Sequence, residues 1–84
     1  MMVGGWTPYR SLKPEDAAVF KTAMAGFVGV HYTPSSGSTQ VVAGENYRFK
    51  CMASMPPADV MWEAIVEIYQ PLKGPAHITG ILKV

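Results

Sequence analysis

The chain has 84 residues, of which 49% are hydrophobic and 15% charged, and its formal net charge at pH 7 is +1. This length predicts a single domain over residues 1–84, and the composition is typical of a folded globule rather than a disordered tail. The near-neutral charge provides no basic field for nucleic acid and no polybasic run for a membrane surface. We therefore expect neither a nucleic-acid partner nor a membrane partner.

The single cysteine and the lack of a recognisable targeting signal further restrict the class of protein to which the chain can belong. Cys51 is the only cysteine, so no internal disulfide can form, and we expect a small buried side chain on a strand. No N-terminal stretch has the charged and apolar regions of a signal peptide, and no window approaches the roughly 18 apolar residues of a membrane span. We expect the chain to be either cytosolic or the mature part of an exported precursor.

Residues 1–13 are predicted to form an extended lead, because they contain Gly4, Gly5 and Pro8 and few periodic apolar residues. Trp6 and Tyr9 are expected to anchor the second half of this lead to the body of the domain as a short strand.

A helix is predicted to begin at Pro14, because the missing N–H of proline costs nothing at the first helical position. The acidic residues that follow favour the positive end of the helix dipole. Gly26 and Gly29 are expected to end the helix. One stripe at helical spacing is predicted to pack on the core, and it consists of Ala17, Phe20, Met24 and Phe27.

From Val28 onward the apolar residues recur with a period of two, which predicts strands. Residues 34–38 interrupt this period and predict either a bulge or a loose strand segment before Gln40. Clean alternation from Asn46 to Ser54 predicts the next strand. Its inner face consists of Tyr47, Phe49, Cys51 and Ala53.

Residues 60–70 fit a helical face through Trp62, Ile65, Val66 and Tyr69, and a strand face through Trp62, Ala64, Val66 and Ile68. The β-branched and aromatic content and the preceding Pro56-Pro57 turn favour the strand. After a turn over residues 70–75, the last strand has a predicted inner face of Ile78, Gly80, Leu82 and Val84. One helix followed by four strands in successive hairpins predicts an α+β fold, with the helix covering one face of the sheet.

Few residues suggest catalysis. His31 and His77 lack the spacing of metal ligands, and Glu63 and Glu67 are expected to form a solvated strand face. There is no glycine-rich phosphate loop. We expect no enzyme, no catalytic residues, no metal site and no cofactor.

Residues 40–44 read Gln-Val-Val-Ala-Gly. This pentapeptide resembles the signature loop of the cystatins, reversible protein inhibitors of papain-like cysteine proteases. The continuation Glu45-Asn46-Tyr47 and the segment Ile78-Thr79-Gly80 are similar to the stefins, the type 1 cystatins, which lack disulfides and are about this long. The layout of Gly-Gly lead, helix and hairpins is similar over nearly the whole chain, whereas the specific match lies in residues 40–47.

The resemblance implies a cystatin-like α+β fold, with one N-terminal helix packed across a curved antiparallel sheet of four to five strands. It implies a thiol protease inhibitor whose partners are papain-like enzymes of the papain and cathepsin type. A stefin-like chain would be cytoplasmic and monomeric. Two copies could also exchange the helix and first strands in a domain-swapped dimer if the hairpin loop straightened.

The resemblance also implies a binding site made of three segments that together form a wedge for the protease cleft. In this chain the segments are Gly4 and Gly5, then Gln40, Val41, Val42, Ala43 and Gly44, and finally Pro71, Leu72, Lys73 and Gly74. Met2 and Val3 are the expected occupants of the non-primed subsites, and Leu72 is the expected apolar contact on the primed side.

Two features depart from the family pattern. The second hairpin lacks the Pro-Trp pair of many secreted cystatins, so affinity from that side is expected to be weaker. Residues 35–38 are more polar and pliable than expected on the strand that leads into the first hairpin, and if they loosened its loop, binding would cost more ordering entropy. The alternative function is a protein-binding or structural module that kept the cystatin fold and the loop without the inhibitory activity.

Overall fold

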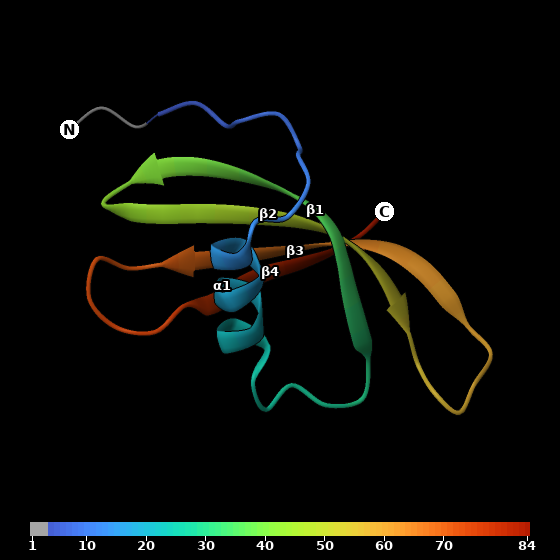
Figure 1. The fold of residues 1–84 in the computed structure, drawn as a ribbon. Helices are drawn as coiled ribbons and strands as arrows, with labels where there is room; N and C mark the ends of the chain where they lie inside the picture. The colour runs from blue at the N-terminus through green and yellow to red at the C-terminus, as the bar shows by residue number, and fades with distance from the viewer. Residues whose placement is uncertain (1–3) are drawn as a thin grey trace.

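The computed structural model describes residues 4–84, and within them it contains one helix and four strands. The strands form a single antiparallel sheet in the order β1-β2-β3-β4, so each strand pairs with the next one along the chain. The helix lies across one face of this sheet, against β3 and β4 (Figure 1). This is the predicted α+β fold. The elements are α1 (Pro14–Met24), β1 (His31–Val42), β2 (Gly44–Ser54), β3 (Met61–Gln70) and β4 (His77–Lys83).

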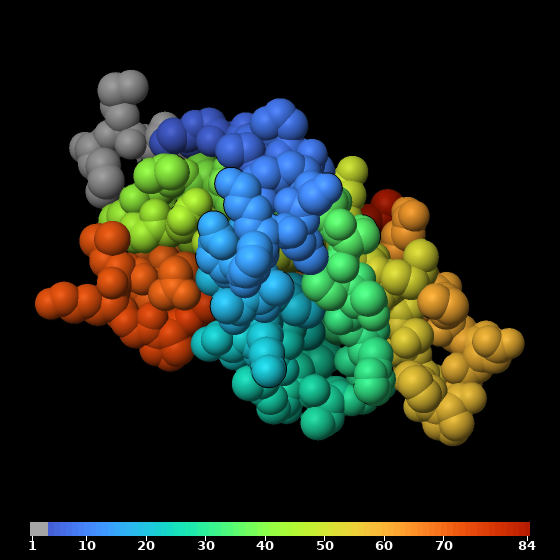
Figure 2. Space-filling model, viewed as in Figure 1, coloured from blue at the N-terminus to red at the C-terminus, as the bar shows by residue number. Residues whose placement is uncertain are grey.

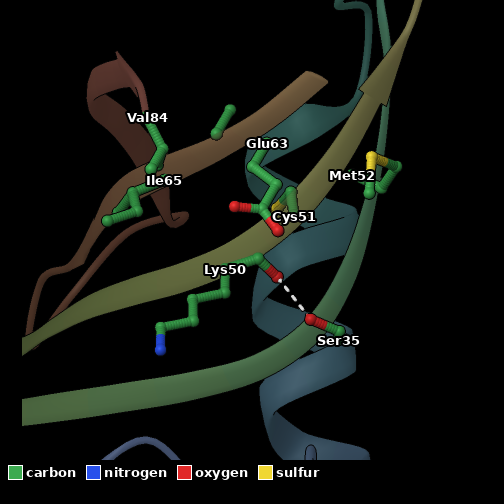
Figure 3. Close-up of a pocket in the computed structure, with 8 residues that line it drawn as sticks. Ser35, Lys50, Cys51, Met52, Glu63, Ile65 and Val84 are labelled. Atoms are coloured by element: carbon green, nitrogen blue, oxygen red, sulfur yellow. Dashed lines mark hydrogen bonds between the residues drawn. The ribbon is translucent and has the colours of Figure 1, made fainter. Parts of the chain in front are cut away.

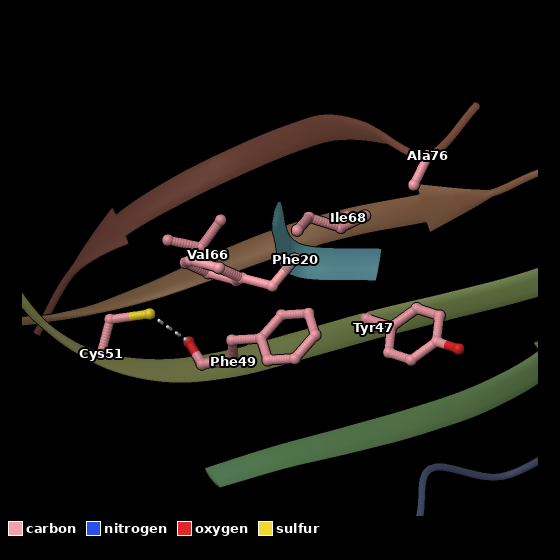
Figure 4. Close-up of a cluster of buried hydrophobic side chains, with 7 residues drawn as sticks. All are labelled: Phe20, Tyr47, Phe49, Cys51, Val66, Ile68 and Ala76. Carbon is pink, nitrogen blue, oxygen red and sulfur yellow. Dashed lines mark hydrogen bonds between the residues drawn. The ribbon is translucent and has the colours of Figure 1, made fainter. Parts of the chain in front are cut away.

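The core lies between α1 and the sheet face that it covers, which we call the inner face (Figure 4). Phe49 is fully buried, and the ring of Phe20 meets it edge-on with the ring centroids 5.0 Å apart. The ring of Tyr47 lies parallel to that of Phe49, with the ring centroids 5.6 Å apart. The remaining members of the cluster are Cys51, Val66, Ile68 and Ala76.

The alternating strands behave as predicted. Tyr47, Phe49, Cys51 and Ala53 are all buried, and residues 61–70 form β3, with Ala64, Val66 and Ile68 buried. Burial raises the pKa of the Cys51 thiol to about 11, so this cysteine is a structural side chain.

The predicted helical stripe is partly wrong. α1 begins at Pro14 as expected, and Gly26 and Gly29 follow its end, but Ala17 is exposed. Phe27 lies beyond the last turn, where its ring packs against Tyr32 at 5.7 Å. The residues of α1 that face the core are instead Asp16, Val19, Phe20, Ala23 and Met24. An apolar pattern could not find this face, because its first member is a carboxylate.

Asp16 is 2% exposed and ties the helix to the lead. Its carboxylate accepts a hydrogen bond from the backbone N–H of Lys13 at 2.8 Å, which satisfies a donor at the start of the helix. Both terminal nitrogens of Arg10 donate to the same carboxylate. The hydrogen bond from Arg10 holds the pKa of Asp16 below its usual value, although burial alone would raise it.

The interruption before Gln40 is a bulge. Pro34 pairs with Cys51 and Ser36 with Lys50, which leaves Ser35 as the extra residue, and β1 bends at this point (Figure 1). The hydroxyl of Ser35 donates to the carbonyl of Lys50 at 3.2 Å. The following residues Gly37, Ser38 and Thr39 are buried, so the strand is packed where it approaches the first hairpin.

The predicted inner face of the last strand is wrong beyond its first residue. Ile78 and Ile81 pack against the core, whereas Leu82 and Val84 are 52% and 72% exposed. Ile78 pairs with Ile68, but Gly80 pairs with Glu67, so β4 carries an extra residue between them. This second bulge moves every later side chain to the opposite face.

The lead is extended, as predicted, and runs antiparallel along the free edge of β1. The N–H groups of Gly4, Thr7 and Arg10 donate to carbonyls of β1 at 2.9–3.0 Å. Among residues 4–13 only Arg10 forms a bridge, with Gly37, so this part of the lead runs irregularly beside the sheet rather than as a regular strand. No helix in residues 4–84 combines the length and apolar character that would cross a membrane.

We predict that Asp16→Asn lowers the free energy of unfolding at pH 7 by about 1–2 kcal/mol, because it removes a buried charge-assisted hydrogen bond. The folded-state pKa of Asp16 is depressed, so its stabilisation is present above the unfolded pKa of about 3.9 and is lost as the pH falls through the folded-state value. Urea unfolding between pH 7 and pH 2 should therefore show the gap between wild type and variant closing below about pH 4. Asp59→Asn, in the exposed turn before β3, is the matched control. A constant gap down to pH 2 would contradict this role.

Candidate functional site

The three segments singled out in the sequence lie together at one end of the molecule. The N-terminal part of the lead, the turn between β1 and β2, and the connection between β3 and β4 all reach the left side in Figure 1. We call this the three-segment edge, and define it as residues 4–5, 40–44 and 71–74. Met2 and Val3, the expected subsite occupants, lie outside the described residues.

The lead joins the first hairpin through Gly4. Its N–H donates to the carbonyl of Val41 at 3.0 Å, and a Cβ at this position would lie 3.4 Å from that oxygen. Gly5 is exposed, and a Cβ there would meet nothing within 4 Å. The structure therefore fixes the first glycine against the hairpin, while space around the second is open.

The first hairpin turns tightly. Val42 pairs with Gly44, which leaves Ala43 alone at the tip. Gly44 has a φ of +104°, a region that side chains other than glycine rarely enter. A Cβ there would also lie 2.3 Å from the carbonyl oxygen of Gln70 and 3.1 Å from the Cα of Pro71. The two hairpins approach so closely that only glycine fits between them.

Side chains at the end of β3 complete the junction. The hydroxyl of Tyr69 donates to the carbonyl of Ala43 and so holds the tip of the first hairpin. The amide of Gln70 donates to the carbonyls of Pro71 and Gly74 at 3.0 and 2.9 Å, which closes the second loop on itself. The amide of Asn46 donates to the side-chain oxygen of Gln40 at 3.0 Å and braces the base of the first hairpin.

The three-segment edge presents apolar side chains to solvent. Val41 is 64% and Leu72 80% exposed, and Ala43 is exposed as well. Lys73 is the only charged residue in the set. Figure 2 shows the β1–β2 turn in light green and the second loop in orange as adjoining parts of one end, from which the second loop protrudes.

The structure thus brings together most of the predicted site residues. Gly4 contacts Val41, and Gly44 abuts Gln70 and Pro71. Leu72 and Lys73 extend into solvent without such support, since both are exposed. Tyr69 and Gln70 are the residues that the sequence analysis missed as parts of this edge. Tyr69 directly precedes the predicted turn and Gln70 begins it, which was the available signal, but only the meeting of the two hairpins shows their role.

The other polar residues considered earlier lie elsewhere or are paired. Glu67 lies on the outer sheet face with its carboxylate 3.2 Å from Nε of Arg48, and Glu63 is exposed. The ring of His77 packs edge-on against Tyr69 at 5.7 Å. Within residues 4–84 no group of three or more His, Cys, Asp or Glu side chains is placed to hold a metal ion.

A separate hollow of about 370 Å³ lies on the sheet away from the three-segment edge (Figure 3). It shares no residue with that edge. Lys50 and Glu63 supply its charged groups, and the other lining residues are Ser35, Cys51, Met52, Ala64, Ile65 and Val84.

Comparison with known proteins found no family model, no curated protein and no solved structure that matches this chain. A functional proposal must therefore rest on the residues of the chain and their geometry.

We predict that Gly44→Ala destabilises the fold by more than the cost of its backbone conformation alone. Gly29 is the matched control, because its φ is +98° and a Cβ there would meet nothing within 4 Å. Gly29→Ala should cost about 1 kcal/mol of unfolding free energy from backbone strain, and Gly44→Ala about 2–4 kcal/mol because Gln70 and Pro71 must also move. Denaturant unfolding measures both. Equal losses of unfolding free energy in the two variants would show that the two hairpins can move apart at residue 44 without a free-energy cost.

Proposed function

We propose that the chain is a reversible, tight-binding inhibitor of papain-like cysteine proteases. The observation that carries the proposal is the meeting of three segments at one edge: the Gly4–Gly5 part of the lead, the Gln-Val-Val-Ala-Gly hairpin and the Pro71–Gly74 loop. The sequence resemblance to the stefins supplies the expected partner, and the geometry supplies a surface of suitable shape and chemistry.

The physical requirements of such an inhibitor fit this edge. A papain-like protease has an extended cleft with a Cys–His pair at its base. A blocker must fill this cleft with apolar surface without offering a scissile carbonyl to the thiolate. Val41 and Ala43 offer such a surface at a hairpin tip.

The tip is also pre-organised. Tyr69 holds the carbonyl of Ala43, and Gly44 lies against the second loop. Groups that are already ordered lose little entropy on binding, so more of the contact energy appears as affinity. Ser38 and Thr39, which precede the tip, are buried and so also keep this part of the hairpin ordered before binding.

The second loop contributes a single large apolar side chain. Leu72 is 80% exposed at the end of a loop that Gln70 closes through two hydrogen bonds. In the proposed complex it packs on the primed side of the cleft, in place of the tryptophan that many secreted cystatins carry there.

A competition assay with papain and a fluorogenic peptide tests the function directly. We expect stoichiometric, reversible inhibition with an inhibition constant below about 1 μM, since specific protein interfaces of this kind are typically at least that tight. A folded chain that leaves papain active at micromolar concentration would overturn the proposal and favour a non-inhibitory binding module. Leu72→Ala should raise the inhibition constant roughly tenfold, from the apolar area it withdraws. Met61→Ala is the matched control, because Met61 is 65% exposed at the far end of the sheet.

Deletion of residues 1–5 is expected to weaken papain binding by roughly 5- to 30-fold, the range of about 1–2 kcal/mol for a minor anchor segment. The reason is that Gly4 lies beside Val41 and so belongs to the three-segment edge. Dissociation of the complex, followed by recovery of protease activity after dilution, should account for most of the change. An unchanged dissociation rate would show that the lead is not part of the binding surface.

A further inference from the structure

Two aromatic side chains of the lead lie over cations of a strand that the lead does not adjoin. Cζ of Arg48 is 4.1 Å from the ring centroid of Trp6, and Nζ of Lys50 is 4.2 Å from that of Tyr9. Both cations belong to β2, whereas the lead hydrogen-bonds to β1. Each pair therefore meets across β1.

The residues of β1 between the partners are small. Ser38 pairs with Arg48 and Ser36 with Lys50, so these serines lie on the outer sheet face, opposite α1. Ser38 is nevertheless only 2% exposed, and its hydroxyl donates to the carbonyl of Thr7 in the lead. A long side chain at either serine would occupy the space in which an aromatic ring and its cation meet. The small side chains of Ser36 and Ser38 thus leave the space that the two aromatic–cation contacts need.

The first pair belongs to a longer row across the outer face. Nε of Arg48 lies 3.2 Å from a carboxylate oxygen of Glu67 on β3, so the guanidinium is held from both sides. Gly80 of β4 pairs with Glu67, and a Cβ there would lie 3.0 Å from the other carboxylate oxygen. Two small residues, Ser38 between Trp6 and Arg48 and Gly80 beyond Glu67, make room for the row Trp6–Arg48–Glu67.

The backbone pairs the lead with β1 irregularly. Gly4, Thr7 and Arg10 donate to β1 at every third residue, and the N–H of Gly37 donates in return to the carbonyl of Arg10 at 2.9 Å. The two aromatic–cation pairs lie next to these bonds, at Trp6 beside Thr7 and at Tyr9 beside Arg10. Such pairs are worth about 0.5–1 kcal/mol each at exposed sites, or about two- to five-fold in an equilibrium.

We propose that Trp6 and Tyr9 are positioning residues, which use Arg48 and Lys50 to hold the lead along β1 and so place the Gly4 segment beside Val41 before a partner binds. This inference rests on the proposed function for its consequence, namely that an ordered lead binds the protease cleft with a smaller loss of entropy. The serines at 36 and 38 and the glycine at 80 are then requirements of this arrangement.

Amide hydrogen exchange of the full chain tests the positioning itself. Trp6→Ala should speed exchange at the N–H groups of Gly4 and Thr7 by about two- to five-fold, with no change at the amides of Phe49 and Val66 in the core. Trp6→Phe, which keeps a ring, should restore most of the protection. The matched control is Lys83→Met, because Lys83 lies over Trp62 at 5.7 Å at the other end of the sheet, away from the lead. Unchanged exchange in Trp6→Ala, or equal acceleration in the core, would overturn the proposal.

Papain binding then tests the consequence. In a chain that inhibits papain, Trp6→Ala should raise the inhibition constant by the same two- to five-fold, and Lys83→Met should leave it unchanged. Faster exchange with an unaltered inhibition constant would overturn the role in binding. If wild type does not inhibit papain, the proposed function fails, while the exchange result still decides whether the aromatic pairs position the lead.

Discussion

The candidate site depends on one close approach, that of the backbone at Gly44 to the carbonyl of Gln70. A Cβ at residue 44 would lie 2.3 Å from that oxygen, so the two hairpins can meet only because this residue is glycine. Once they meet, Tyr69 reaches the carbonyl of Ala43, and Pro71 begins the second loop directly beside the first. The single missing side chain thus allows two exposed apolar loops to form one surface.

The lead adds the third segment through side chains as well as through backbone hydrogen bonds. Its few hydrogen bonds to β1 are supplemented by Trp6 and Tyr9, which reach the cations of β2 across small residues. The serine run that interrupts the apolar pattern of β1 therefore has a structural reason. In the sequence alone it looked like a weakness of the strand, because the neighbours that cover Ser38 are some thirty residues away, as its bond to Thr7 illustrates.

Sequence patterns predicted the elements well and their faces less well, and the failures share a cause. The helix start at Pro14 and the inner face of β2 follow from local rules of capping and alternation. The predicted inner face of β4 was wrong beyond Ile78, because a bulge opposite Glu67 moves the later side chains to the other face of the sheet. The helical stripe was partly wrong, because Asp16 occupies a core position with Arg10 as its partner, whereas the predicted Ala17 is exposed. The bulge is defined by how β4 pairs with β3, and Asp16 is paired with a residue of the lead, so both features depend on a second element.

The sequence by itself determined the order of one helix and four strands, the positions of the turns and the apolar hairpin at residues 40–44, because each of these depends on neighbours within a few positions. Only the tertiary structure decided which segments share an edge and which side chains hold them there. The contacts of Gly44 with Gln70, Trp6 with Arg48 and Arg10 with Asp16 join separate segments. Their energies depend on distances that the linear pattern does not contain.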